Sequence, residues 1–278
     1  MSSITNAMTV DVEDYFQVSA FEKYIPRESW DDLDLRVEAN VDAILEIFSE
    51  HDVKATFFLL GWVAEKCPGM IHKITEQGHE LASHGYSHVR VHDQQRDEFR
   101  EDIVKTKQIL EDISGKSIAG YRAASFSVNK EEHWVHEELM QAGFKYSSSV
   151  YPIRHDLYGI PDGKRYPYKP FDGDLIEVPV TTLEFFGLRI PCGGGGYFRL
   201  FPYQLSSWFI RKINSSEKSP CIFYFHPWEL DIDQPRLEKL DWKTNFRHYN
   251  GIEQMNDRLS RLSKEFVWDR MDNVFLGA

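Results

Sequence analysis

The sequence predicts an α/β fold organised around a parallel sheet, because strand-like and helix-like segments alternate along its first half. Five short apolar runs have the length and composition of buried strands, at residues 7–12, 55–60, 80–83, 118–123 and 146–150. Repeated strand–helix units favour parallel strands joined by right-handed crossovers. The chain has 278 residues, a length that suits a single α/β barrel with functional groups at the carboxyl ends of its strands.

Each predicted helix repeats apolar residues at helical spacing. These helices cover residues 37–51, 67–77, 96–115, 130–143, 202–214 and 252–265. Gly78 follows the second helix, at the position where glycine commonly ends a helix. A last core strand is predicted at 220–225, directly before His226.

The regular alternation stops between about residues 151 and 201. This segment is rich in Pro, Gly, Tyr and Arg and has weak helical periodicity, which indicates an irregular or hairpin insertion. Four glycines at 193–196 lack the flanking residues of nucleotide-binding loops, so we expect a turn that admits close approach of substrate or backbone. We expect one domain over 1–278, with its motifs between about 7 and 227 and a C-terminal extension at 228–278.

Composition narrows the class of protein. Hydrophobic residues make up 42% and charged residues 27%, as in ordinary globular chains. The formal net charge of −12 disfavours a nucleic-acid partner. Three scattered cysteines indicate neither a disulfide framework nor a cysteine zinc site. Because no signal-peptide pattern or membrane-spanning apolar run is visible, we expect a cytoplasmic protein without a transmembrane segment.

Two polar clusters follow predicted strands. Asp11, Glu13 and Asp14 come directly after the first strand, and carboxylates this close repel each other unless a cation lies among them. His84 and His88 follow another strand at a spacing that lets two imidazoles bind one ion. Each pattern alone also fits a helix N-cap or a chance histidine pair. Together they predict an open site for Zn²⁺, Co²⁺ or another first-row divalent ion.

Two further residues occupy strand ends in the same predicted sheet. Arg122 follows the strand at 118–123 closely enough for its guanidinium to hold a catalytic carboxylate ionised, although an ordinary surface ion pair would look the same. His226 ends the last core strand, where it could serve as a general acid or simply be a buried core histidine.

In this order the motifs resemble those of the polysaccharide deacetylase family, also called the NodB-homology group or carbohydrate esterase family 4. The run from Thr9 to Asp14 resembles the family's Thr-Phe-Asp-Asp motif. The run from Ser83 to His88 resembles its His-[Ser/Thr]-x-x-His motif, with Gly85 departing at the second position. The resemblance extends over about residues 7–227.

The later motifs are shorter but fall in the family's order. Arg122 matches the arginine motif, and His226 matches the histidine of the final Leu-x-His motif. The Asp-Val-Glu-Asp-Tyr-Phe run, the Gly-rich run ending at Arg199 and the His-Pro-Trp-Glu run resemble a subgroup linked to bacterial exopolysaccharide biosynthesis.

The resemblance implies a distorted, incomplete β/α barrel and metal-dependent hydrolysis of N-acetyl groups on a carbohydrate, which releases acetate. It implies one divalent ion, with zinc preferred, and an N-acetylated carbohydrate as substrate. In the matching positions, Asp11 is the general base, Arg122 its brace and His226 the general acid. His84 and His88 are metal ligands.

The third ligand stays open because Val12 replaces the family's usual second aspartate. Glu13 shares the face of Asp11 if the strand stays extended, whereas Asp14 becomes available if the chain turns there. We favour Asp14, which preserves a short carboxylate.

Other departures leave alternative functions open. The aspartate of the family's fourth motif is missing from the run at 146–149, so another residue, such as Asp156, is expected to orient His226. One alternative is a metal-independent, allantoinase-like amidohydrolase acting on a small cyclic ureide. Another is an inactive carbohydrate-binding homologue. Aromatic residues of the second half either stack on sugars or serve ordinary packing: Tyr166, Tyr168, Tyr197, Phe198 and Trp228.

Overall fold

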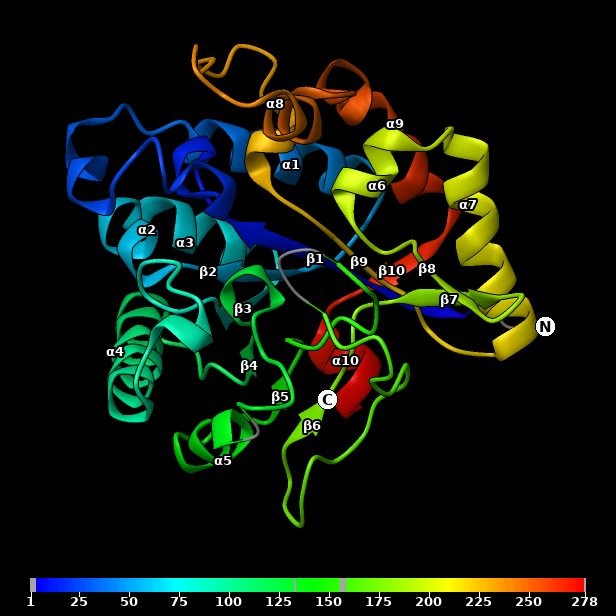
Figure 1. Ribbon diagram of the computed structural model, residues 1–278, viewed down its shortest axis with the longest axis horizontal. Helices are drawn as coiled ribbons and strands as arrows, with labels where there is room; N and C mark the ends of the chain where they lie inside the picture. The colour runs from blue at the N-terminus through cyan, green and yellow to red at the C-terminus, as the bar shows by residue number, and fades with distance from the viewer. Residues whose placement is uncertain (1–3, 133, 156–158, 278) are drawn as a thin grey trace.

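The predicted α/β class is confirmed, and the parallel sheet lies at the centre of the molecule (Figure 1). The computed structural model describes residues 4–132, 134–155 and 159–277. Within them, eight strands form one parallel sheet: β1 (Thr5–Val12), β2 (Thr56–Leu59), β3 (Glu80–Ser83), β4 (Gly120–Tyr121), β5 (Tyr146–Ser147), β6 (Ile176–Glu177), β9 (Ile222–Phe225) and β10 (Val267–Asp269). An antiparallel hairpin comprises β7 (Thr182–Phe185) and β8 (Leu188–Pro191).

Strand β1 is the organising strand of the sheet. Its residues 7–10 pair with β9 on one edge, while 5–7 pair with β10 and 9–12 pair with β2 on the other. From β2 the order continues through β3, β4 and β5 to β6. Among the described residues β6 and β9 form no ladder with each other, so the barrel is incomplete, as predicted.

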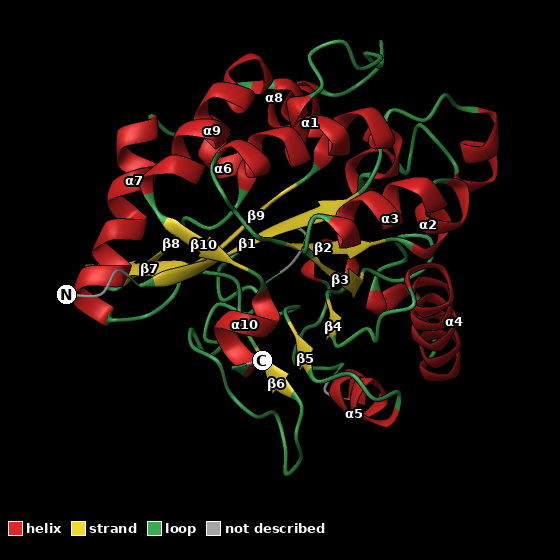
Figure 2. Ribbon diagram, turned by 180° about the vertical axis from the view of Figure 1, so that it is seen from behind, coloured by secondary structure: helices red, strands yellow, loops and turns green. Residues whose placement is uncertain are grey.

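Helices surround this sheet (Figures 1 and 2). Helices α1, α8 and α9 lie on the side of β1 and β9, whereas α4 and α5 lie beyond β3 and β4. No helix of the described residues is long and apolar enough to span a membrane. The helices are α1 (Val37–Glu50), α2 (Gly61–Lys66), α3 (Pro68–Glu76), α4 (Arg96–Ser114), α5 (Trp134–Gln141), α6 (Gly195–Leu200), α7 (Tyr203–Lys212), α8 (Trp242–Tyr249), α9 (Met255–Glu265) and α10 (Met271–Leu276).

The two faces of β1 have different surroundings. Met8, Val10 and Val12 pack into the main apolar core with the surrounding helices. Ala7 belongs to a smaller cluster on the other face, which includes Phe58 and Tyr146. Because side chains alternate along a strand, Asp11 points to the same face as Ala7. The strand therefore delivers a carboxylate into the barrel interior at its carboxyl end.

The second half of the chain is more regular than predicted. The segment 151–201 contains β6, the β7–β8 hairpin and α6, which begins at Gly195 inside the predicted glycine turn. The extension 228–278 contains α8, α9, β10 and α10, and β10 joins the main sheet. In contrast, the strand predicted at 146–150 shortens to β5, because the N–H groups of Ser149 and Val150 donate to the Glu177 carboxylate.

Helix α10 is attached to the amino-terminal ends of β2 and β3, at the end of the sheet opposite the carboxyl ends of the strands. Met271 N donates to Thr56 Oγ1 (2.8 Å) and Asp272 N donates to Glu80 Oε2 (3.2 Å). Glu80 is buried and also accepts from Tyr146 Oη at 3.0 Å. Burial, reinforced by the nearby Asp272 carboxylate, raises the pKa of Glu80 to about 7.

We predict that Glu80 makes folding stability depend on pH. The pKa of Glu80 in the folded protein lies above the ordinary value of 4.5. Glu80 therefore contributes fully to the free energy of unfolding below pH 4.5, and this contribution is lost as the pH rises through about 7. Denaturant unfolding of the wild type and Glu80→Gln, at about pH 5 and about pH 8, should show a larger wild-type advantage at the lower pH. An advantage that does not change with pH would contradict this assignment.

Candidate functional site

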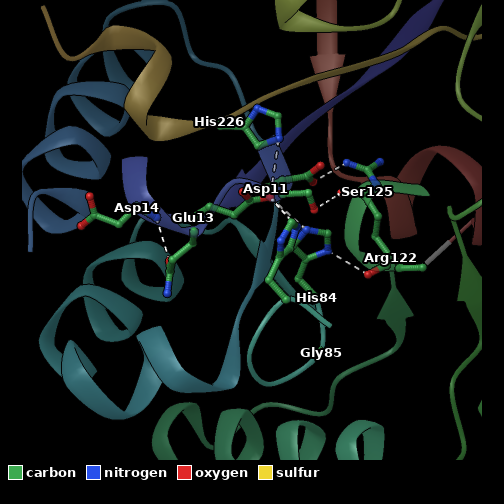
Figure 3. Close-up of polar contacts among 12 residues, drawn as sticks. Asp11, Glu13, Asp14, His84, Gly85, Arg122, Ser125 and His226 are labelled. Atoms are coloured by element: carbon green, nitrogen blue, oxygen red, sulfur yellow. Dashed lines mark hydrogen bonds and ion pairs between the residues drawn. The ribbon is translucent and has the colours of Figure 1, made fainter. Parts of the chain in front are cut away.

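Side chains from several strand ends meet at one mouth of the sheet (Figure 3). Glu13 follows β1, His84 follows β3 and His226 follows β9. Parallel strands direct their carboxyl ends to the same edge, which explains why residues so distant in sequence converge. The structure thus brings together Asp11, His84, His88, Arg122 and His226, as the sequence predicts.

Three buried side chains form a cluster suited to a metal ion. Glu13, His84 and His88 each offer one ligand atom, and these atoms lie within 4.8 Å of one another. Glu13 Oε1 is 3.3 Å from Nε2 of His84 and 3.0 Å from Nε2 of His88. Although burial opposes the negative charge, His88 and His226 hold the pKa of Glu13 well below its usual range.

The hydrogen bonds of the two histidines fit this role. Nδ1 of His84 lies 2.8 Å from the Arg122 carbonyl oxygen, to which it donates, and this fixes the ring with Nε2 directed at Glu13. Nδ1 of His88 is buried and makes no hydrogen bond within the described chain, and the buried Nε2 has only its close contact with Glu13. A buried polar atom without a partner is costly. A cation held by two imidazoles and one carboxylate would satisfy it.

The loop that carries both histidines has a constrained backbone. Gly85 has φ +77°, and an added Cβ would lie 3.1 Å from Asp102 Oδ1. His88 also has a positive φ, 54°. Arg27 fixes the loop by donating to the carbonyl oxygens of Ser87 (2.9 Å) and His88 (3.1 Å). The departure from the family motif at Gly85 therefore has a local steric reason.

Asp14, our preferred third ligand, is placed elsewhere, and that preference is corrected. Its Oδ2 accepts from the backbone N–H groups of Arg36 (2.7 Å) and Val37 (2.9 Å), at the beginning of α1. Its Oδ1 accepts from Tyr15 N at 2.8 Å. Figure 3 shows Asp14 turned away from the histidines. Glu13, directly after β1, occupies the position beside them, and its N–H donates to the Asp11 carbonyl oxygen at 3.0 Å.

Asp11 and Arg122 form a buried ion pair next to this cluster. Arg122 Nη1 is 2.6 Å from Asp11 Oδ1, and the guanidinium is fully buried. It also donates to Thr9 Oγ1 (2.9 Å), Ser148 O (3.2 Å) and Ser148 Oγ (3.1 Å). Its flat face lies 4.0 Å from the centre of the Phe58 ring. Arg122 is therefore a rigid internal brace, not a surface ion pair.

Residues 146–149, where the aspartate of the family's fourth motif is missing, help to hold the Arg122 side chain in place. Ser148 supplies two acceptors to Arg122, and Glu177 from β6 holds the following backbone through the N–H groups of Ser149 and Val150. His136 Nε2 lies 3.0 Å from the same carboxylate, which is fully buried. A glutamate from the next strand thus fixes the serine run.

His226 faces the cluster from the other side, and its side chain is 20% exposed. Its Nε2 lies 3.6 Å from Glu13 Oε1, whereas its Nδ1 lies 2.9 Å from Glu229 Oε1. Burial would lower the pKa of His226, but the carboxylates of Glu13 and Glu229 outweigh it and raise this pKa to about 9. Glu229 thus holds Nδ1 of His226, whereas Asp156, which was expected to orient this histidine, lies outside the described residues.

The sequence reasoning missed Glu229, although a signal was present. An acid three residues after His226, at the start of a short helical turn, has the spacing of a capping box. The structure contains this arrangement in residues 226–229.

Phe198 and Trp228, considered as sugar-stacking candidates, are buried instead. Tyr166 is 44% exposed.

Two family models match consecutive parts of the chain. Residues 29–146 match the model described as polysaccharide deacetylase, and residues 148–276 match a domain of unknown function, DUF3473. A peptidoglycan-N-acetylglucosamine deacetylase of Bacillus cereus is 44% identical over 72 residues, 26% of each chain. A peptidoglycan deacetylase of Helicobacter pylori is 27% identical over 208 residues, 74% of this chain and 66% of that one. The chain therefore spans less than two thirds of either relative.

Solved structures share the fold at low identity. A Mycobacterium smegmatis structure assigned to the polysaccharide deacetylases has a TM-score of 0.60 at 19% identity and covers 97% of this chain and 88% of that one. A mutant of a Bacillus anthracis family pseudoenzyme with restored activity has a TM-score of 0.51 at 14% identity, over 98% and 68% of the two chains. The first half of the chain, residues 29–146, is thus similar to polysaccharide deacetylases, and the second half, residues 148–276, matches the DUF3473 domain.

Proposed function

We propose that this protein hydrolyses N-acetyl groups on a carbohydrate with the help of one divalent metal ion. The observation that carries the proposal is the buried cluster of Glu13, His84 and His88, which lies between an arginine-paired aspartate and a carboxylate-held histidine. This arrangement contains a ligand set, a base and an acid, which are the groups that metal-assisted amide hydrolysis requires.

We assign Glu13, His84 and His88 as the metal ligands. When bound, the ion supplies Lewis-acid polarisation of the acetyl carbonyl. Asp11 makes no contact with the two histidines among the hydrogen bonds and ion pairs described above, and its partner is Arg122. It therefore stays available as the group that accepts the proton of the attacking water.

Arg122 and His226 complete the proposed assignment. Arg122 keeps Asp11 anionic and fixes its direction, because its own guanidinium is held by Thr9 and Ser148. His226 donates through Nδ1 to Glu229, so the proton on Nε2 faces the site. There it can pass to the amine nitrogen as the C–N bond breaks and acetate is released.

The carbohydrate class is supported by the names of the relatives. They include peptidoglycan deacetylases and chitooligosaccharide deacetylases. The buried ligand cluster gives no support to the metal-independent ureide amidohydrolase. The presence of Asp11, Arg122 and His226 supports an active enzyme over an inactive binding homologue. Zinc as the native ion, an exopolysaccharide as substrate and a cytoplasmic location stay predictions.

The first test separates the two candidate carboxylate ligands. Glu13→Ala should lose the metal, as should His84→Ala and His88→Ala, because each removes a ligand atom. Asp14→Ala should keep the metal but lose about 1–3 kcal/mol of stability, because buried N–H groups at the start of α1 lose their acceptor. Metal content after dialysis and thermal unfolding measure the two effects. Metal loss in Asp14→Ala alone would restore Asp14 as the ligand.

The second test concerns the base and the acid. Asp11→Asn and His226→Ala should each retain metal but release acetate from acetylated chitooligosaccharides about 10²–10⁴-fold more slowly. Metal content serves as the control for the integrity of the site. Near-normal turnover in His226→Ala would leave it a core histidine. No acetate release by the metal-loaded wild type, on any acetylated glycan, would favour the inactive homologue.

A further inference from the structure

His226, the residue proposed as the acid, is connected to the end of helix α8 by a series of contacts through Glu229 and Arg199. Glu229 Oε1 accepts from both Nδ1 and the backbone N–H of His226, at 2.9 and 3.0 Å. Its other oxygen, Oε2, is 2.6 Å from Nε of Arg199, and both side chains are almost fully buried. Burial disfavours the charged form of Glu229, but Arg199 and His226 outweigh it and lower its pKa to about 2.

Arg199 is anchored independently of the site. Nη1 donates to the carbonyl oxygens of His248 (2.8 Å) and Asn250 (2.5 Å), and Nη2 donates to Arg247 O (3.2 Å). These carbonyls belong to the carboxyl end of α8, where a cation is favoured by the helix dipole. Arg199 therefore connects the end of one helix to the carboxylate that holds His226.

Gly195 leaves room for this carboxylate. A Cβ at Gly195 would lie 2.4 Å from Glu229 Oε1 and 2.6 Å from Oε2. The carboxylate cannot give way without breaking its contacts with Arg199 and His226. Gly196, the next residue in α6, has no atom within 4 Å of its added Cβ. Only one glycine of this pair is required by the site.

We propose that Arg199 and Gly195 are positioning residues for proton donation by His226, acting through Glu229. The inference rests on the proposed function, because it presumes that His226 is the acid. The Arg199–Glu229 pair fixes the ring so that Nδ1 points at Glu229 and Nε2 points into the site. Neither residue contacts the ligand cluster, so metal binding and the base at Asp11 should be independent of them.

The His226 ring is also stacked on Trp228, but this stacking alone does not determine where Nδ1 points. The Arg199–Glu229 pair must do so. The His226 ring stacks on Trp228 with centroids 5.3 Å apart and an angle of 16°, and Trp228 stacks on His248 at 4.1 Å and 11°. Stacking fixes the plane of the ring but is equally satisfied after a 180° turn about the Cβ–Cγ bond, which exchanges Nδ1 with Cδ2. Only a directional partner at Nδ1 removes this freedom.

The test compares two leaving groups. An acetamido sugar releases an amine, which must receive a proton from His226 as the C–N bond breaks. A nitrophenyl acetate releases a phenolate, a stable anion that leaves without that proton. Both substrates use the same metal ion and the same base. A defect in acid positioning therefore slows the amide and spares the ester, whereas general damage to the structure slows both.

The variants are chosen in matched pairs. Arg199→Met and Gly195→Ala should lower amide kcat by about 10- to 100-fold, with KM and metal content near wild type and ester kcat little changed. Arg199→Lys should recover part of the amide rate. Gly196→Ala should match the wild type on both substrates. Arg258→Met is the control for α6 packing, since Arg258 donates to the carbonyl oxygens of Phe198, Arg199 and Phe201 but not to the Glu229 carboxylate, and it should affect both substrates equally.

The outcomes separate this inference from the proposed function. Equal losses on ester and amide, or no loss in Gly195→Ala, would overturn the positioning role. A metal-loaded wild type that hydrolyses neither substrate would overturn the function instead. The positioning role is then decided by NMR of the His226 Nδ1–H proton. That signal should be absent in His226→Ala, displaced in Gly195→Ala and unchanged in Gly196→Ala. An unchanged signal in Gly195→Ala would refute the role.

Discussion

Negative charge buried at the carboxyl end of β1 must be neutralised within a few ångströms, and the architecture of the site follows from this constraint. An unpaired buried carboxylate is costly enough to unfold a domain or to take up a proton. Each carboxylate here meets the requirement differently. Asp11 pairs with Arg122, Asp14 accepts backbone N–H groups and Glu229 pairs with Arg199. Within the described part of the chain, the ion-pair partners of Glu13 are all histidines, so among these carboxylates it is the one without a permanent cation beside it.

Much of the site could be predicted from sequence because it depends on strand ends. The carboxyl ends of parallel strands meet at one edge, so Asp11, His84 and His226 had to converge once their strands were identified. The choice between Glu13 and Asp14 could not be made in this way. It depends on whether the backbone stays extended after Val12, and on the start of α1 more than 20 residues later, whose N–H groups bind Asp14.

The parts of the fold that were not predicted are those with weak local signals. Strand β10 has only three residues, and it pairs with Thr5–Ala7 at the other end of the chain. No periodicity can emerge from so short a segment. The residue that orients His226 was expected at Asp156, because the aspartate of the family's fourth motif is missing from this chain. It came instead from the turn that follows His226, supported by Arg199 from α6.

The pairing of β1 has a consequence for how the chain matures during synthesis. Both β9 and β10, which flank the first strand, emerge from the ribosome long after it. Contacts so distant in sequence form late, because the loop-closure entropy must be overcome first. The nascent chain therefore carries His84 and His88 before it has the strand that delivers His226. Until the last elements dock, Asp11 lies on a strand without its β9 neighbour, with Glu13 directly after it, and the complete cluster of side chains forms only with the complete sheet.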